Sequence, residues 1–103
     1  MTQRVVHQPR VAWDVARTVV DVADTSDDLS TWLTARLDHL LGPSYGRDFT
    51  TTRIRLRRGE PPSIRQVEIG LWRARLEDVL RANPDLAENL TILRLDLAQR
   101  LRS

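Results

Sequence analysis

Residues 63–102 read SIRQVEIGLWRARLEDVLRANPDLAENLTILRLDLAQRLR, and they hold most of the long apolar side chains of the chain. Apolar residues recur there at spacings of three and four, which predicts two amphipathic helices. Pro84 disfavours helical geometry at Asn83, and Asn is a good N-cap, so the boundary between the helices falls at these two residues. The segment therefore predicts a helical fold with consecutive helices over 63–82 and 84–102.

The first of these helices has an unusually wide apolar arc. Its members are Ile64, Val67, Ile69, Leu71, Trp72, Ala74, Leu76, Val79 and Leu80. An arc this wide is typical of a helix that packs against neighbours on two sides. We therefore expect 63–82 in the middle of the fold, between the last helix and the helices of residues 10–41.

The last helix has a narrower stripe of Leu86, Leu90, Leu93, Leu97 and Leu101, which resembles a coiled-coil seam. Ile92 and Leu95 lie off this stripe. We expect the chain to associate with itself, as a homodimer. The predicted contact residues are Leu86, Leu90, Leu93 and Leu97, or the off-stripe Ile92 and Leu95.

Two more helices precede this segment. In residues 10–23 the valines and alanines fill one side of a helical wheel, and alternating Arg and Asp fill the other. Residues 26–41 begin with a capping serine followed by two acids, which favours a helix start at Ser26. Gly42 and Pro43 end this helix, and we expect a loop over 42–50.

Residues 50–57, TTTRIRLR, alternate between moderately apolar and basic side chains. A period of two predicts a strand with an arginine face, ended by Gly59 and the prolines that follow. A lone strand leaves backbone groups unpaired, so it would need residues 3–7 or the same strand of a second copy as its partner.

The fold class predicted is mainly α: four helices in a single domain, 1–103, with a short Arg-rich β segment between the second and third helices. The alternative is an α+β fold in which that segment forms a small two-stranded sheet. Residues 1–8 are either a tail or an edge strand.

Composition excludes several classes of protein. Cysteine is absent, which excludes disulfides and thiolate metal sites, and all 16 basic residues are arginine. No apolar run reaches the ~18–20 residues needed to cross a bilayer, and Pro9 and Arg10 interrupt any signal-peptide core. We therefore expect a cytoplasmic protein that does not act in a membrane.

The sequence offers no catalytic constellation. His7 and His39 are the only histidines and have no metal-ligand spacing, while the acids are explained by helix capping and by charge pairs along a helix. Residues 42–46, GPSYG, lack the pattern of a phosphate-binding loop. We predict a protein that is not an enzyme and that uses no cofactor, metal or small-molecule substrate.

Positive charge is concentrated in one stretch, at Arg53, Arg55, Arg57, Arg58 and Arg65. On a strand, alternate arginines would lie about 6.5–7 Å apart on one face. Such a face has three possible roles: it is a solvent-exposed edge of a sheet, a surface that binds an acidic protein, or a site that binds nucleic-acid phosphates. The predicted function is a non-enzymatic helical adaptor that binds another protein and self-associates; the alternative is a nucleic-acid-binding regulator that uses these arginines.

Overall fold

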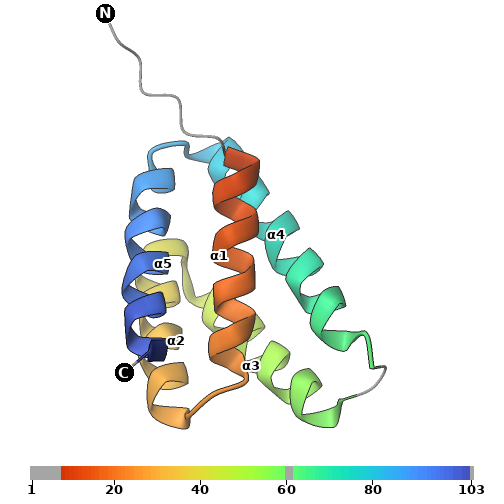
Figure 1. Ribbon diagram of the computed structural model, residues 1–103. Helices are drawn as coiled ribbons and strands as arrows, with labels where there is room; N and C mark the ends of the chain where they lie inside the picture. Colours follow the sequence, from red (N-terminus) through yellow and green to blue (C-terminus); the bar gives the residue numbers. More distant parts are fainter. Residues whose placement is uncertain (1–7, 60–61, 103) are drawn as a thin grey trace, which may run out of the picture.

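The structure is a computed structural model that describes residues 8–59 and 62–102, and these residues form five helices. The helices are α1 (Gln8–Ala23), α2 (Asp27–Leu41), α3 (Pro43–Arg58), α4 (Ile64–Ala82) and α5 (Leu86–Arg102) (Figure 1). A mainly α fold is thus confirmed, but the predicted number of four helices is wrong. Residues 3–7, the predicted strand partner, lie outside the described residues.

The predicted Arg-rich strand is part of α3, and the predicted loop 42–50 supplies the first half of the same helix. The alternation of apolar and basic residues over 50–57 does not correspond to a buried and an exposed face of a strand. Thr52 is buried, whereas Ile54, which a strand would place beside it, is 48% exposed. The burial follows helical spacing instead, because Tyr45, Phe49, Thr52 and Leu56 all pack inward.

Gly42 explains why a second helix follows α2 without a loop. Its φ of 110° ends α2, with its N–H donating to the Asp38 carbonyl, and Pro43 then occupies the first position of α3. Proline is well suited to that position because its missing N–H would have no partner there. The Gly46 N–H donates to Asp38 Oδ1 at 3.1 Å, and a Cβ at Gly46 would collide with that carboxylate as it is placed here.

The other predicted boundaries are close to the observed ones. Ser26 accepts a hydrogen bond from the Leu29 N–H at the start of α2, as the sequence predicts. Asn83 ends α4 and Leu86 begins α5, so the break at Asn83 and Pro84 is confirmed. Ser63 precedes α4, but its side chain makes no capping hydrogen bond.

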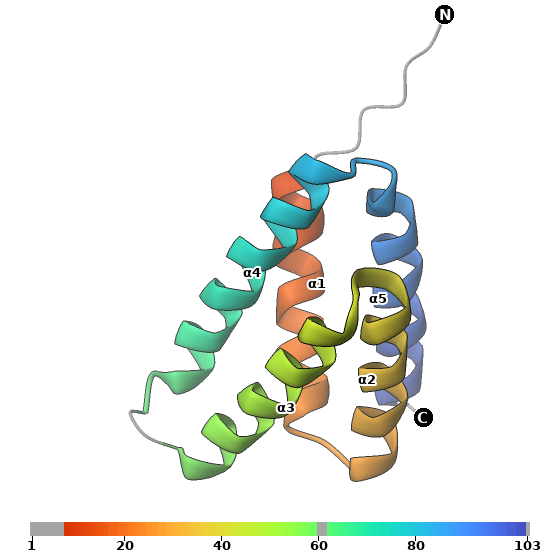
Figure 2. The same cartoon turned by 180° about the vertical axis from the view of Figure 1, so that it is seen from behind.

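The central helix is α1, not α4. It packs against all four of the other helices, with α5 and α4 on either side of it and α2 and α3 behind (Figures 1 and 2). Its inward residues are small or β-branched, and all of them are buried: Ala12, Val15, Ala16, Val19, Val20, Val22 and Ala23. Such side chains let several helices approach one axis closely.

This arrangement corrects the position expected for α4. Both α4 and α5 make their main contacts with α1 and only slight contacts with each other. The core side of α4 consists of Ile69, Trp72, Leu76 and Leu80. Ile64 and Val79 of the wide apolar arc are half-buried, whereas Val67, Leu71 and Ala74 are exposed. No helix in the described ranges is long and apolar enough to cross a bilayer.

Candidate functional site

The five predicted binding arginines lie at the C-terminal half of α3 and the start of α4, and most of them hold the helices together. Arg53 Nη2 lies 2.8 Å from Asp27 Oδ1, and its Nε donates to the Ala23 carbonyl at 3.4 Å. Arg57 Nη2 reaches the same Asp27 oxygen at 3.2 Å. These contacts attach α3 to the start of α2.

Arg53 and Arg57 both lower the pKa of the Asp27 carboxyl. The hydrogen bond and the charge of Arg53 hold the pKa of the Asp27 carboxyl below its ordinary value of 3.8, and the Arg57 charge lowers it further. Both partners favour the ionised carboxylate.

Arg55 completes a buried polar network between α3 and α4. Trp72 Nε1 donates to Thr52 Oγ1 at 2.8 Å, and that hydroxyl donates to Glu68 Oε1 at 2.7 Å. Arg55 Nη1 donates to the other carboxylate oxygen, Oε2, at 3.2 Å. Thr52, Glu68 and Trp72 are buried, so each polar group needs the partner that the network provides.

Of the remaining two arginines, Arg65 has an acidic partner and Arg58 does not. Arg65 makes an ion pair with Asp21, which attaches α4 to α1. Arg58 is exposed and makes no ion pair with any residue in the described ranges. Four of the five predicted arginines therefore have an acidic partner within the chain.

The predicted self-association residues of α5 also separate into two groups. Leu90, Leu93 and Leu97 are buried in the core of the single chain, and Leu86 packs partly against it. Only Ile92 and Leu95 are exposed, at 59% and 54%. Apart from each other, their neighbours one helical turn away are all polar except Ala98: Glu88, Asn89, Thr91, Asp96, Ala98 and Gln99.

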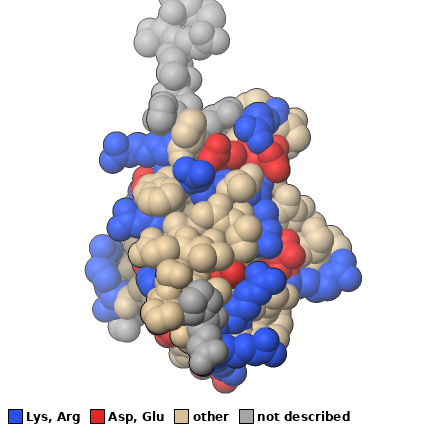
Figure 3. Space-filling view, turned by 90° about the vertical axis from the view of Figure 1, so that its right-hand side faces the viewer, with Lys and Arg blue, Asp and Glu red and all other residues tan. Residues whose placement is uncertain are grey.

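The outer face of α4 carries a longer apolar surface. Val67 is 47% exposed and Leu71 is 39% exposed, and the exposed Ala74 and the half-buried Gly70 continue the same side of the helix. We call these four residues, Val67, Gly70, Leu71 and Ala74, the α4 outer face. Seen from the side of α4, uncharged side chains fill the centre of the surface, with many basic and some acidic side chains around them (Figure 3).

The sequence indicated this surface only indirectly. Val67 and Leu71 belong to the wide apolar arc that we assigned to the core, and the arc is wider than the available neighbours can cover. The buried network was not predicted, because Thr52 was assigned to a strand. Thr52 and Glu68 lie on different helices, and no local pattern relates them.

Possible metal ligands do not cluster in the described residues. No group of three or more His, Cys, Asp or Glu there could hold a metal ion. A hollow beside α1 and α4 is lined mainly by charged side chains, and the Arg73 guanidinium lies 5.7 Å from the Trp13 ring centre there. This stacking is a cation–π contact that joins the two helices.

Comparison with known proteins gives no relative: no family model matches the chain, and no curated protein or solved structure matches it either.

Proposed function

We propose that the chain is a non-enzymatic helical protein–protein interaction module that self-associates, and that the α4 outer face is its contact surface. One observation carries this proposal: Val67 and Leu71 remain substantially exposed on one face of a helix whose other side already completes the core. Fully burying a Val or Leu side chain is worth about 1.5–3 kcal/mol, and a second protein could recover somewhat less than half of that at each of these two residues, which are 47% and 39% exposed.

The α4 outer face is better suited to this role than the exposed pair on α5. Val67 and Leu71 are separated by one helical turn and are continued by Gly70 and Ala74, so their apolar surface is contiguous. Ile92 and Leu95 are surrounded by polar residues, as scattered surface side chains commonly are. Contiguous exposed apolar surface, not single exposed residues, marks interaction sites.

Nucleic-acid binding is the alternative, and it has less support. Phosphate binding needs arginines whose charge is available, whereas Arg53, Arg55, Arg57 and Arg65 each have a carboxylate partner within the chain. Breaking such pairs would offset part of the gain from each phosphate contact. The adaptor role and a cytoplasmic location stay predictions.

Light scattering over a concentration series tests the proposal. We expect the mean mass to rise from 11.9 kDa toward twice that value between low and high micromolar concentration. A constant mass of 11.9 kDa up to several hundred micromolar would contradict the proposed self-association.

A further inference from the structure

We propose that the outer side of α3 binds an acidic helical segment of another protein. The surface consists of four residues that share one side of the helix: Arg47, Thr51, Ile54 and Arg58. We call these four residues the α3 outer stripe. It lies on a different helix from the α4 outer face, so this inference goes beyond self-association and does not depend on it.

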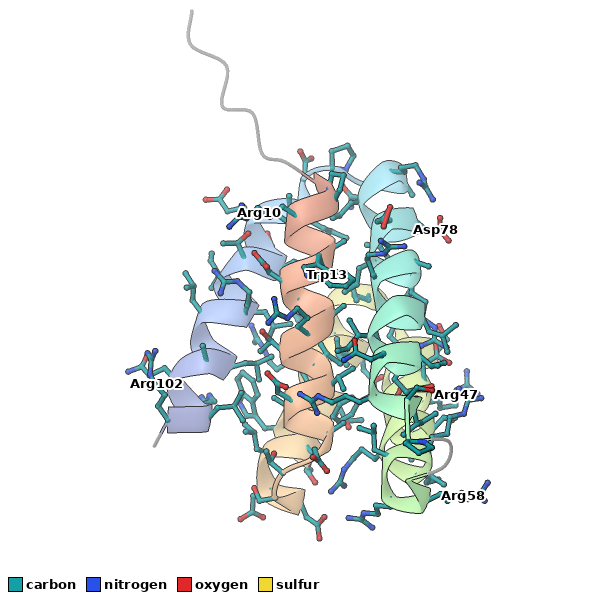
Figure 4. The ribbon with its side chains drawn as sticks, turned by 45° about the vertical axis from the view of Figure 1, so that its right-hand side comes forward. Arg10, Trp13, Arg47, Arg58, Asp78 and Arg102 are labelled. Carbon is teal, nitrogen blue, oxygen red and sulfur yellow. The ribbon has the colours of Figure 1, made fainter. Side chains whose placement is uncertain are left out.

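The α3 outer stripe is a line of exposed side chains. Its members follow one another at spacings of four, three and four residues, so each is a neighbour of the next on the helix surface. All four are exposed, and Ile54 is 48% exposed. At about 1.5 Å per residue, Arg47 and Arg58 lie about 16 Å apart along α3, with Ile54 between them. Both arginines extend outward from the same edge of the molecule, Arg47 above Arg58 (Figure 4).

The centre of the stripe is less polar than its composition suggests. Thr50 and Thr51 lie one helical turn before Ile54. The Thr51 hydroxyl donates to the Arg47 carbonyl at 3.2 Å, and the Thr50 hydroxyl donates to the Gly46 carbonyl at 3.2 Å. Because both hydroxyls are already bonded within α3, the surroundings of Ile54 have little need of a polar partner. The stripe thus has an aliphatic centre and two cationic ends.

Positive charge around the stripe exceeds the negative charge available to it. The sequence of α3 contains five arginines and one acid, which is more positive charge than the +2 of the entire chain. That acid, Asp48, pairs with Arg75 of α4 at 3.4 Å. The carboxylates that other helices bring to α3 are those of Asp27 and Glu68, and three arginines share these two groups.

The excess charge lies at the two ends of the stripe. Neither Arg47 nor Arg58 makes an ion pair with any residue of the described part of the chain. Each guanidinium can therefore form a bidentate pair with a carboxylate of a partner without breaking a pair within the chain. Arg47 was not part of the predicted set, because residues 42–50 were expected to form a loop.

These features fit an acidic protein better than a nucleic acid or a second α3 outer stripe. Two stripes of the same kind would repel each other, because their ends carry like charges. Nucleic-acid affinity depends on several phosphate contacts, whereas the stripe offers two arginines with Ile54 between them. A protein segment supplies both carboxylates and an aliphatic side chain. Charge and apolar surface are then satisfied together.

A helix is the form of partner that suits this surface. Recognition of an extended peptide by strand addition needs the edge of a sheet, and the described ranges contain helices only. Two helices pack side by side at about 8–10 Å, so a partner helix along α3 repeats its spacing. The partner would carry an aliphatic residue with acidic residues four positions to one side and seven to the other, opposite Arg58 and Arg47 respectively.

A synthetic peptide tests this inference with the full chain. The peptide has about 19 residues, with one central leucine, glutamates four and seven positions away on either side, and alanine and glutamine elsewhere. This symmetry suits a parallel and an antiparallel partner alike. Its fluorescently labelled form would be titrated with protein at about 20 mM salt and followed by anisotropy. Exposed ion pairs are weak, so we expect a Kd on the order of 100 micromolar.

Two double variants of the protein separate the stripe from general electrostatic attraction. Arg47→Gln combined with Arg58→Gln should weaken peptide binding about fivefold or more. Arg17→Gln combined with Arg102→Gln removes the same charge at exposed positions of α1 and α5, and should change the Kd less than twofold. Ile54→Gln should also weaken binding, by about threefold, and so should glutamine in place of the central leucine of the peptide.

Three results would overturn the inference. Equal weakening by the two double variants would show attraction to positive charge in general and no site on α3. Absence of peptide binding would remove the acidic partner and leave the α4 outer face unaffected, because that surface belongs to another helix. Tighter binding of a single-stranded RNA of equal charge, lost when Arg47 and Arg58 are replaced, would assign the stripe to nucleic acid.

Discussion

Thr52 Oγ1 and Glu68 Oε1 share a buried hydrogen bond of 2.7 Å across the α3–α4 contact. The same hydroxyl accepts the indole N–H of Trp72, so one side chain satisfies two buried polar groups. The same two helices are also joined by the Arg55–Glu68 and Arg75–Asp48 ion pairs and by the edge-on contact of the Phe49 and Trp72 rings. The hydrogen bond is the buried polar part of this contact.

Replacing Thr52 by valine tests this role with little change of volume. We expect Thr52→Val to lower the free energy of unfolding by about 1–3 kcal/mol, because both Glu68 and Trp72 lose a buried partner. Thr51→Val is the matched control, since the Thr51 hydroxyl is exposed and bonds only to the Arg47 carbonyl of its own helix. Its effect should stay within about 0.5 kcal/mol in urea denaturation. Equal effects of the two substitutions would contradict the role assigned to the network.

Asp27 provides a prediction about pH. Its pKa lies below 3.8 in the folded protein, mainly because of Arg53 and less because of Arg57. A depressed carboxyl pKa contributes stability above the unfolded pKa, and this contribution is lost as the pH falls through the folded value. We expect Arg53→Gln to raise the Asp27 pKa toward 3.8 by a larger amount than Arg57→Gln does, as followed by NMR titration. An Asp27 pKa that neither substitution changes would show that the pairs do not form in solution.

Gly70 and Gly59 should respond oppositely to alanine. Gly70→Ala adds a Cβ in open space within a helix, so we expect it to stabilise the dilute monomer by about 0.5–1 kcal/mol. Gly59 ends α3 with a φ of 66°, where a side chain is strained, and Gly59→Ala should destabilise by about 1–2 kcal/mol.

The same Gly70→Ala substitution should weaken self-association, because it adds a side chain in the middle of the α4 outer face, where glycine allows a second helix to approach closely. Light scattering over a concentration series measures this directly, with the Gly59→Ala chain as a control that leaves α4 unchanged. A stabilised monomer that associates as strongly as the original chain would argue against close packing at Gly70.

Arg58 is the residue through which the nucleic-acid alternative can be tested. Since the other four arginines of the predicted set have acidic partners, we expect little retention of a short DNA duplex or RNA strand at low salt. A true phosphate site would show a steep salt dependence, and Arg58→Gln would reduce its slope by about one. Strong, salt-sensitive binding would favour the regulator over the interaction module.

The sequence predicts the helices of this protein better than their arrangement. The start of α2 at Ser26 and the break at Asn83 follow from local rules of capping and proline geometry. The start of α3 was missed although Pro43 is typical of a first helical position, because the glycines around it and the alternation over 50–57 suggested a loop and a strand. Alternation over eight residues was too short to outweigh the helical spacing of Phe49, Thr52 and Leu56.

The candidate site could be predicted only in part. Ile92 and Leu95 were correctly placed off the stripe of α5, but nothing local distinguishes Val67 and Leu71 from core residues. Their exposure depends on α1 occupying the centre, which is a property of the whole arrangement. Likewise, the ion pairs of Arg53 and Arg55 join residues 26 and 13 positions apart, beyond the reach of periodicity.

The most direct test of the α4 outer face is sedimentation equilibrium of two matched variants, Leu71→Glu and Ile92→Glu. Both replace an exposed apolar residue by the same charge, so neither should disturb the core. Leu71→Glu should weaken self-association at least tenfold, since it places a desolvated charge in the contact twice, whereas Ile92→Glu should leave it unchanged. Loss of association in Ile92→Glu with normal association in Leu71→Glu would contradict the account.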